Sequence, residues 1–217
     1  IYNKMELKTF LQTKNGAAVE LSIFYIVAVS ISSMFACGFI LYPLALTSLG
    51  VRKIEWRDIG FGFKDFTIFK ILLGVAVAVA YYFIDQNIVN PIASRFAAPG
   101  LPEIFNIQGD VSKYIIGLTL SWTTAAFLEE IVFRGYLINR FIDLMWETLI
   151  TKILIILMTG IGFGFVHSYQ GMNGAISAGF IGVFQAMVYF MNGKKLAIPI
   201  IAHGVYDTIG FTLLFLG

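Results

Sequence analysis

Charged side chains are scarce in this sequence. Asp, Glu, Lys and Arg make up 13% of the 217 residues, about half of their usual share in a soluble domain. Hydrophobic residues make up 58%. This balance excludes an ordinary soluble domain and predicts a polytopic membrane protein, with the lipid bilayer as a partner.

The charge balance and the cysteine count exclude further classes of protein. The net charge is +2, which is too small to indicate nucleic-acid binding. Cys37 is the only cysteine, so the sequence has neither an internal disulfide bond nor a cysteine-rich metal site. There are only two histidines, His167 and His203.

Long runs without charge predict the membrane spans, because about 20 apolar residues cross a bilayer. Residues 1–20 predict a short interfacial helix or a tail, and the prolines and glycine of 91–102 predict a loop. The fold class is therefore all-α: a single domain over residues 1–217 that forms a polytopic transmembrane helical bundle. Its predicted spans, about six, are 21–46, 68–90, 111–137 with a continuation towards 146, 150–167, 172–192 and 196–217.

Small residues indicate where two of these helices pack. Gly160 and Gly164 form a GxxxG pair, and Gly174, Ala178 and Gly182 continue the same spacing in the next span. Small residues let helices approach closely in lipid. The alternative is that membrane helices are simply rich in glycine.

One charged cluster stands out in the third span. No charge occurs from Tyr114 to Leu128, and then Glu129 and Glu130 are followed by Arg134. A charge at membrane depth is costly and indicates function. Glu130 and Arg134, at i and i+4, share a helix face and are predicted to pair. Glu129 points about 100° away from Glu130, which leaves it as the carboxylate available for chemistry.

Both histidines lie within or at the end of apolar helices. His167 closes the fourth span, and His203 shares a face with Asp207 at i and i+4. In a hairpin that turns near Thr148, Glu129 and His167 are each nineteen residues from the turn and so lie at one depth. His203 is only nine residues from the last turn, at Lys194.

At the helical rise per residue, that difference places His203 about 15 Å from Glu129 and His167 in depth. Two alternatives would resolve it. Either residues 138–149 lie flat at the interface, or a helix is broken, for which Pro199 offers a kink.

These residue types suit the activation of water. In a low-dielectric site Glu129 can act as a general base, with His167 sharing the proton, while His203 and Asp207 support the oxyanion or the leaving group. Alternatively, Glu129, His167 and His203 would be enough ligands for a catalytic zinc ion. A different class of function is also open, since buried Glu, His and Asp form the proton relays of ion-coupled transporters; no inverted repeat supports it.

Three motifs in consecutive apolar helices resemble those of the CAAX-protease and bacteriocin-processing family, the Rce1-like or Abi intramembrane proteases. They are EExxxR at Glu129–Arg134, FxxxH at Phe163–His167 and HxxxD at His203–Asp207. The resemblance covers about residues 112–210. Asp207 stands where the family commonly has asparagine.

The resemblance implies an intramembrane endopeptidase in which Glu129 and His167 activate water. It assigns oxyanion support to His203 and Asp207, and a bracing role to Glu130, Arg134 and Phe163. The cofactor would be none or one zinc ion, and the substrate a membrane-associated or prenylated-type peptide or protein. The expected location is the plasma membrane of a prokaryote. A non-catalytic bacteriocin immunity or regulatory membrane protein with the same fold is the remaining alternative.

Overall fold

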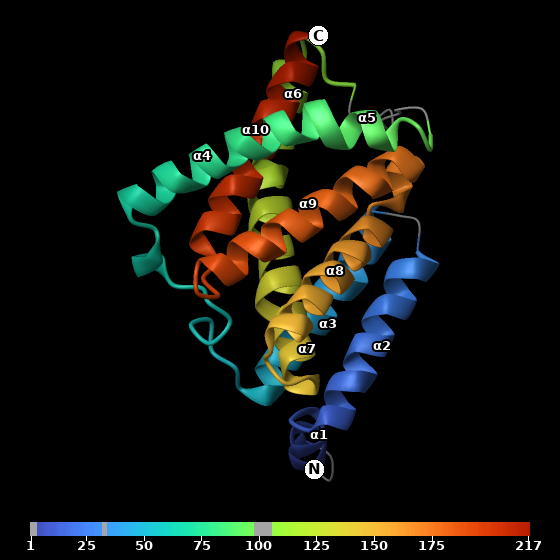
Figure 1. The fold of residues 1–217 in the computed structure, drawn as a ribbon, viewed down its shortest axis with the longest axis vertical. Helices are drawn as coiled ribbons and strands as arrows, with labels where there is room; N and C mark the ends of the chain where they lie inside the picture. Colours follow the sequence, from blue (N-terminus) through green and yellow to red (C-terminus); the bar gives the residue numbers. More distant parts are fainter. Residues whose placement is uncertain (1–3, 32–33, 98–105) are drawn as a thin grey trace.

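The computed structural model describes residues 4–31, 34–97 and 106–217, and all regular structure within these ranges is helical (Figure 1). The α-helices are α1 (Lys4–Leu11), α2 (Lys14–Ser30), α3 (Met34–Arg52), α4 (Ile68–Ile84), α5 (Asn90–Ala93), α6 (Val111–Leu120), α7 (Ile138–Leu144), α8 (Leu149–Val166), α9 (Gly171–Met191) and α10 (Ala197–Leu216). The remaining helical segments are η1 (Phe63–Asp65), η2 (Asp85–Val89), η4 (Ser121–Glu129), η5 (Ile131–Leu137) and η6 (Ser168–Gln170).

Five helical stretches in the described ranges are long and apolar enough to cross a membrane. They are Ile68–Ala93, Val111–Leu144, Leu149–Val166, Ser168–Met191 and Ala197–Leu216, and Gly38–Arg52 is a shorter apolar helix. The prediction of an all-α membrane bundle with about six spans is confirmed. The spans from residue 68 onwards begin and end within a few residues of the predicted bounds.

The N-terminal part differs from the prediction. Residues 21–46 were predicted as one span, but they fall on two helices, α2 and α3. Thr13 caps α2 by accepting a hydrogen bond from the Gly16 N–H, and extended backbone at Ile31 ends it. An absence of charge does not distinguish one helix from two, so the break carries no signal in hydropathy. The predicted loop at 91–102 also begins later, because α5 runs through Pro91 to Ala93; Pro99, Gly100 and Pro102 lie outside the described residues.

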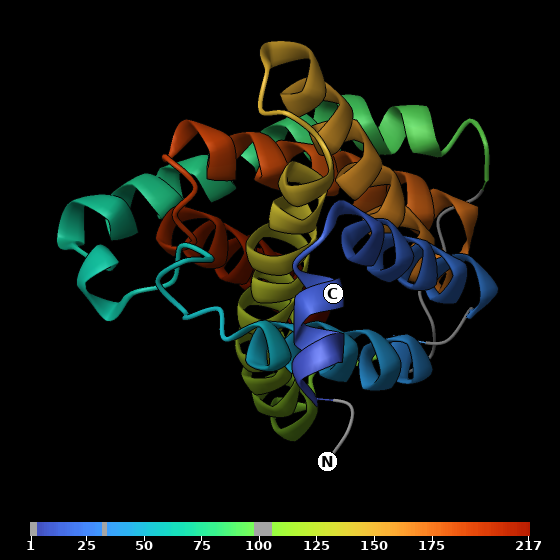
Figure 2. The ribbon, with the colours of Figure 1, turned by 90° about the horizontal axis from the view of Figure 1, so that it is seen from below.

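The helix Val111–Leu144 is the axis of the bundle. It runs along the long direction of the molecule, with α8 and α9 packed in front of it, and α4 and α5 lie across one end (Figure 1). Seen from below, α2 and α3 lie on one side of this helix, while α4 lies on the opposite side (Figure 2). The middle of this helix is π-helical over Ser121–Glu129 and again over Ile131–Leu137. Such segments occur frequently at functional sites.

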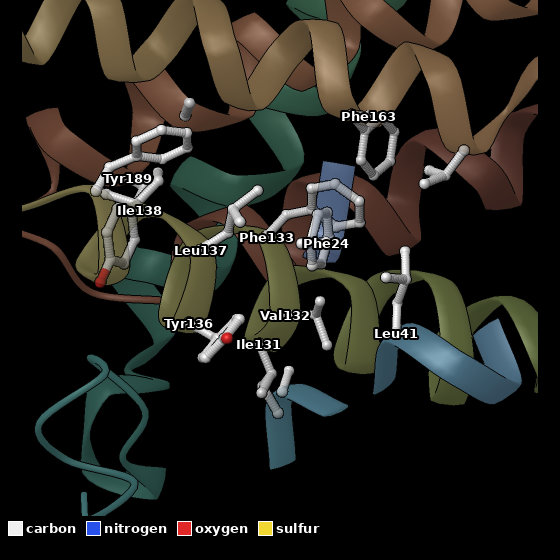
Figure 3. Close-up of a cluster of buried hydrophobic side chains, with 14 of the residues drawn as sticks. Phe24, Leu41, Ile131, Val132, Phe133, Tyr136, Leu137, Ile138, Phe163 and Tyr189 are labelled. Carbon is white, nitrogen blue, oxygen red and sulfur yellow. The ribbon is translucent and has the colours of Figure 1, made fainter. Parts of the chain in front are cut away.

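The core surrounds the C-terminal half of that helix (Figure 3). The ring of Phe133 packs edge-on against Phe24 of α2, at 5.5 Å between centroids, and against Phe163 of α8, at 4.8 Å. Leu41 of α3 is 1% exposed in the same cluster. One aromatic residue therefore joins the N-terminal helices to the hairpin that ends in His167.

Glycines allow α8 and α9 to lie close together, as predicted from their spacing. A Cβ atom on Gly164 would lie 2.7 Å from the Ala175 carbonyl oxygen, and one on Gly182 would lie 2.8 Å from the Cβ atom of Phe163. Both distances are shorter than van der Waals contact, so the glycines have a packing role.

We predict that Gly164→Ala destabilises the protein by about 1–3 kcal/mol, because the added methyl group overpacks this contact. Gly210→Ala is the matched control, since a Cβ atom there meets nothing within 4 Å among the described residues. Thermal unfolding in detergent should show a lower Tm for Gly164→Ala than for Gly210→Ala. Equal Tm values would show that the close packing does not limit stability.

Candidate active site

The Glu130–Arg134 pair is buried at the centre of the bundle. Arg134 Nη1 donates to Glu130 Oε1 at 3.0 Å, and the two side chains are 1% and 0% exposed. Arg134 Nη2 donates to the Gly182 carbonyl oxygen of α9 at 3.1 Å, and the guanidinium lies 4.9 Å from the centre of the Phe163 ring. The pair thus has the geometry of a brace between three helices.

His203 lies against the same carboxylate. Its Nδ1 is 2.8 Å from Glu130 Oε1, and since an ionised carboxylate only accepts, Nδ1 is the donor. His203 and Glu130 therefore share one depth, and the mismatch calculated from the turns does not exist. Neither alternative offered to resolve it is needed: α7 continues the helix beyond residue 137, and α10 is unbroken, with Pro199 in its first turn.

The cause of this error is the assumption that both turns lie at one level. Asn139 Nδ2 donates to Tyr189 Oη at 3.3 Å, and Tyr189 Oη donates to the Ile59 carbonyl oxygen at 3.1 Å. The end of α9 therefore packs beside Asn139, nine residues beyond Glu130. The helix continues past this level as α7 before the next turn. Nine residues along α10 then bring His203 back to Glu130.

Asp207 lies one turn further along α10. Its Oδ2 accepts a hydrogen bond from Ser121 Oγ at 2.7 Å and is 3.8 Å from His203 Nε2. Sequence reasoning did not select Ser121. The available signal was a hydroxyl two helical turns before Glu129 within a charge-free run, but such serines also bond to their own backbone, so the residue type alone is weak.

Glu129 and His167 face a cavity of about 360 Å³. Its wall is mostly apolar and comes from α3, from the helix Val111–Leu144 and from the end of α8. The lining residues are Gly38, Phe39, Leu41, Tyr42, Pro43, Leu46, Leu120, Thr124, Leu128, Glu129, Phe133, Val166, His167 and Tyr169. The prediction that Glu129 and His167 lie at one depth agrees with this arrangement. His203 and Asp207 are not among these lining residues.

The two carboxylates, although adjacent in sequence, have different surroundings. Glu130 is held by Arg134 and His203. Glu129 Oε1 accepts a hydrogen bond from Tyr42 Oη at 3.2 Å. The Oε2 atoms of both glutamates are buried without a hydrogen-bond partner among the described residues, but only Glu129 lines the cavity. Tyr42 was not predicted, because a tyrosine in an apolar span is read as packing.

His167 follows the last residue of α8. Its Nδ1 is 2.8 Å from the Phe163 carbonyl oxygen. A carbonyl oxygen only accepts, so Nδ1 carries the proton and a neutral ring keeps the lone pair of Nε2 available. The His167 ring lies tilted against the Phe163 ring, with 4.4 Å between their centres. Phe163, four residues earlier, therefore contacts His167 through both its backbone and its ring.

The donor set for a zinc ion is not assembled. Across residues 4–31, 34–97 and 106–217, no three His, Cys, Asp or Glu side chains are grouped so that they would hold a metal ion. His203 directs Nδ1 to Glu130, not towards Glu129 and His167. Glu129, His167 and His203 therefore do not fit a shared zinc ion in this arrangement.

The fold and the site together define a class: a polytopic helical membrane protein with a buried acid–arginine–histidine brace beside a carboxylate and an imidazole that face one cavity. Residues 111–209 match the family model described as type II CAAX prenyl endopeptidase Rce1-like. This part of the chain is therefore similar to the Rce1-like family, which confirms the resemblance drawn from the three motifs. The comparisons with curated proteins and with solved structures gave no match.

We predict that Arg134→Met destabilises the protein by about 3–5 kcal/mol, because it leaves the Glu130 carboxylate buried without its charged partner. Arg57→Met is the control: Arg57 pairs with Glu55 at 2.8 Å but is 76% exposed, so its loss should cost less than about 1 kcal/mol. Thermal unfolding of both variants in detergent measures the difference. Similar Tm values for the two variants would contradict the bracing role.

Proposed function

We propose that this protein is an intramembrane endopeptidase in which Glu129 and His167 activate the attacking water. The observation that carries the proposal is that these two side chains line one cavity. A carboxylate and an imidazole with available acceptor atoms are the groups that a general-base mechanism requires. The Rce1-like match over 111–209 supports the same class of reaction.

The proposed reaction is the hydrolysis of a peptide bond. Glu129 takes a proton from water as the water oxygen bonds to the scissile carbonyl carbon, and the carbonyl oxygen becomes an oxyanion. When the C–N bond breaks, the proton passes to the leaving nitrogen, and the products are a carboxylic acid and an amine. His167 Nε2 accepts a hydrogen bond from the water or shares its proton.

Glu130 is the less suitable base of the two acids. Its Oε1 is engaged by the charged groups of Arg134 and His203, and Glu130 is not among the residues that line the cavity, whereas Glu129 is. In the proposed mechanism Glu130, Arg134 and the Phe163 ring are positioning residues that fix the helix on which Glu129 lies.

His203 and Asp207 are proposed to act on the oxyanion side. His203 Nδ1 is engaged by Glu130, whereas Nε2 is 3.8 Å from Asp207 Oδ2, too far for a hydrogen bond. A protonated Nε2 is therefore the ring nitrogen that would donate to the developing negative charge. An ionised Asp207 would repel an oxyanion directly. We therefore assign Asp207 to the orientation of His203, with Ser121 fixing its carboxylate.

The proposed substrate is a peptide that reaches the site from the membrane. Apolar side chains such as Phe39, Leu46 and Leu128 form much of the cavity wall, and such a wall favours an apolar or lipid-modified segment. A farnesylated peptide with a CAAX C-terminus is accordingly the first probe to use.

We predict that the purified protein in liposomes releases the last three residues of a farnesylated CAAX peptide, and that Glu129→Gln and His167→Ala lower kcat at least about 100-fold, the scale of lost general-base catalysis. Mass spectrometry of the products gives the rate and the position of cleavage. Glu147→Gln is the matched control, because Glu147 lies in the loop between α7 and α8 and pairs only with Lys152 and Lys194 among the described residues.

Two results would contradict this mechanism. Full activity in Glu129→Gln would exclude Glu129 as the base, and an inactive wild-type protein would exclude this class of peptide. Proton flux into the liposomes that is lost in Glu129→Gln would instead support the ion-coupled transporter.

We predict that prolonged treatment with a metal chelator leaves the cleavage rate unchanged, because the three candidate ligands do not form a donor set. The zinc content of the purified protein, measured by atomic emission, should be far below one ion per chain. Activity that is lost with the chelator and restored by zinc alone would support the zinc alternative.

A further inference from the structure

The helix α3 supplies a large part of the cavity wall, although it lies outside the region that matches the family. Six of the fourteen lining residues belong to α3: Gly38, Phe39, Leu41, Tyr42, Pro43 and Leu46. The family match begins at residue 111. The site is therefore completed by a helix that none of the three motifs includes.

Tyr42 is the lining residue of α3 that reaches the proposed base. Its hydroxyl group donates to Glu129 Oε1 at 3.2 Å, across 87 positions in the sequence. The phenol is the donor because an ionised carboxylate only accepts. A hydrogen bond from a hydroxyl group to a carboxylate oxygen is directional.

The local structure of α3 holds this hydroxyl group in place. Leu41 and Ala45, one turn apart, are 1% and 0% exposed, which fixes the rotation of the helix about its axis. Gly38 lies one turn before Tyr42, and a Cβ atom on Gly38 would lie 3.4 Å from the Tyr42 ring, so the glycine leaves room for that ring. The phenol is thus placed by packing before any substrate binds.

The contact divides the two oxygens of Glu129 between two roles. Oε1 is held by Tyr42, while Oε2 is buried and accepts no hydrogen bond within the described residues. A carboxylate that can rotate freely presents either oxygen in many directions. One that is fixed through Oε1 presents Oε2 in a single direction, which is what proton transfer from a bound water requires.

We propose that Tyr42 is a positioning residue of the active site, which holds Glu129 through Oε1 so that Oε2 receives the proton of the attacking water. This inference rests on the proposed function and adds to it a residue outside the family motifs. Tyr42 acts on the base and does not itself exchange a proton with the substrate.

The test compares Tyr42→Phe with the wild-type protein in liposomes, with the farnesylated CAAX peptide as the probe. The variant keeps the ring and loses only the hydroxyl group. We expect kcat to fall about tenfold, the scale of one hydrogen bond to a charged group, with KM unchanged. The acid limb of the kcat/KM profile should move to higher pH, because the hydroxyl group favours the ionised form of the base.

Tyr25→Phe is the matched control. Tyr25 lies on the neighbouring helix α2, and its hydroxyl group donates to the Met158 carbonyl oxygen at 2.6 Å, away from Glu129 and His167. We expect this variant to keep the wild-type kcat and the wild-type pH profile. A loss of folded protein would lower the rate of either variant, but it would not move the acid limb.

The outcomes separate this inference from the proposed function. If Glu129→Gln is inactive while Tyr42→Phe keeps the wild-type kcat and acid limb, the role of Tyr42 is excluded and the proposed function stands. If Glu129→Gln is active, the proposed function and the role of Tyr42 are both excluded. A fall in kcat with a moved acid limb in Tyr42→Phe alone supports the assignment.

Discussion

The arrangement of the bundle depends on one buried carboxylate. Glu130 is fully buried and meets Arg134 from its own helix and His203 from α10, while Arg134 also bonds to the backbone of α9 at Gly182. A buried charge that loses its partner costs several kcal/mol, about 3–5 in measured cases. The three helices are therefore held in one register, since sliding any of them would leave a charge without its partner inside the membrane.

This constraint also explains why two adjacent glutamates have different environments. Arg134 and His203 both contact Glu130 Oε1, and the contact with His203 fixes the face of this helix that meets α10, while Glu129 lines the cavity shared with His167. The surrounding π-helical segments, Ser121–Glu129 and Ile131–Leu137, widen the local helix and change the direction of its side chains. A structural acid and a proposed catalytic acid thus lie side by side in the chain.

Local features of this site could be predicted from the sequence, and contacts between distant segments could not. The pairing of Glu130 with Arg134 follows from helix geometry alone. The predicted depth of His203 was wrong because it depends on where the turn between α9 and α10 lies. The position of that turn is set by contacts between separate segments, which involve Tyr189, Asn139 and Ile59. The break between α2 and α3 and the contact of Tyr42 with Glu129 leave no mark in charge or spacing.

Contacts far from the cavity also hold α3 in its position. At its far end, Arg52 pairs with Asp143 of α7 at 3.2 Å, and Asp143 also pairs with Arg140 at 2.7 Å. Arg140 in turn contacts Glu20 of α2. These ion pairs anchor both N-terminal helices to the end of the same long helix that carries Glu129. The wall that contains Tyr42 is therefore attached, by ion pairs that lie outside the site, to the long helix that carries the proposed base.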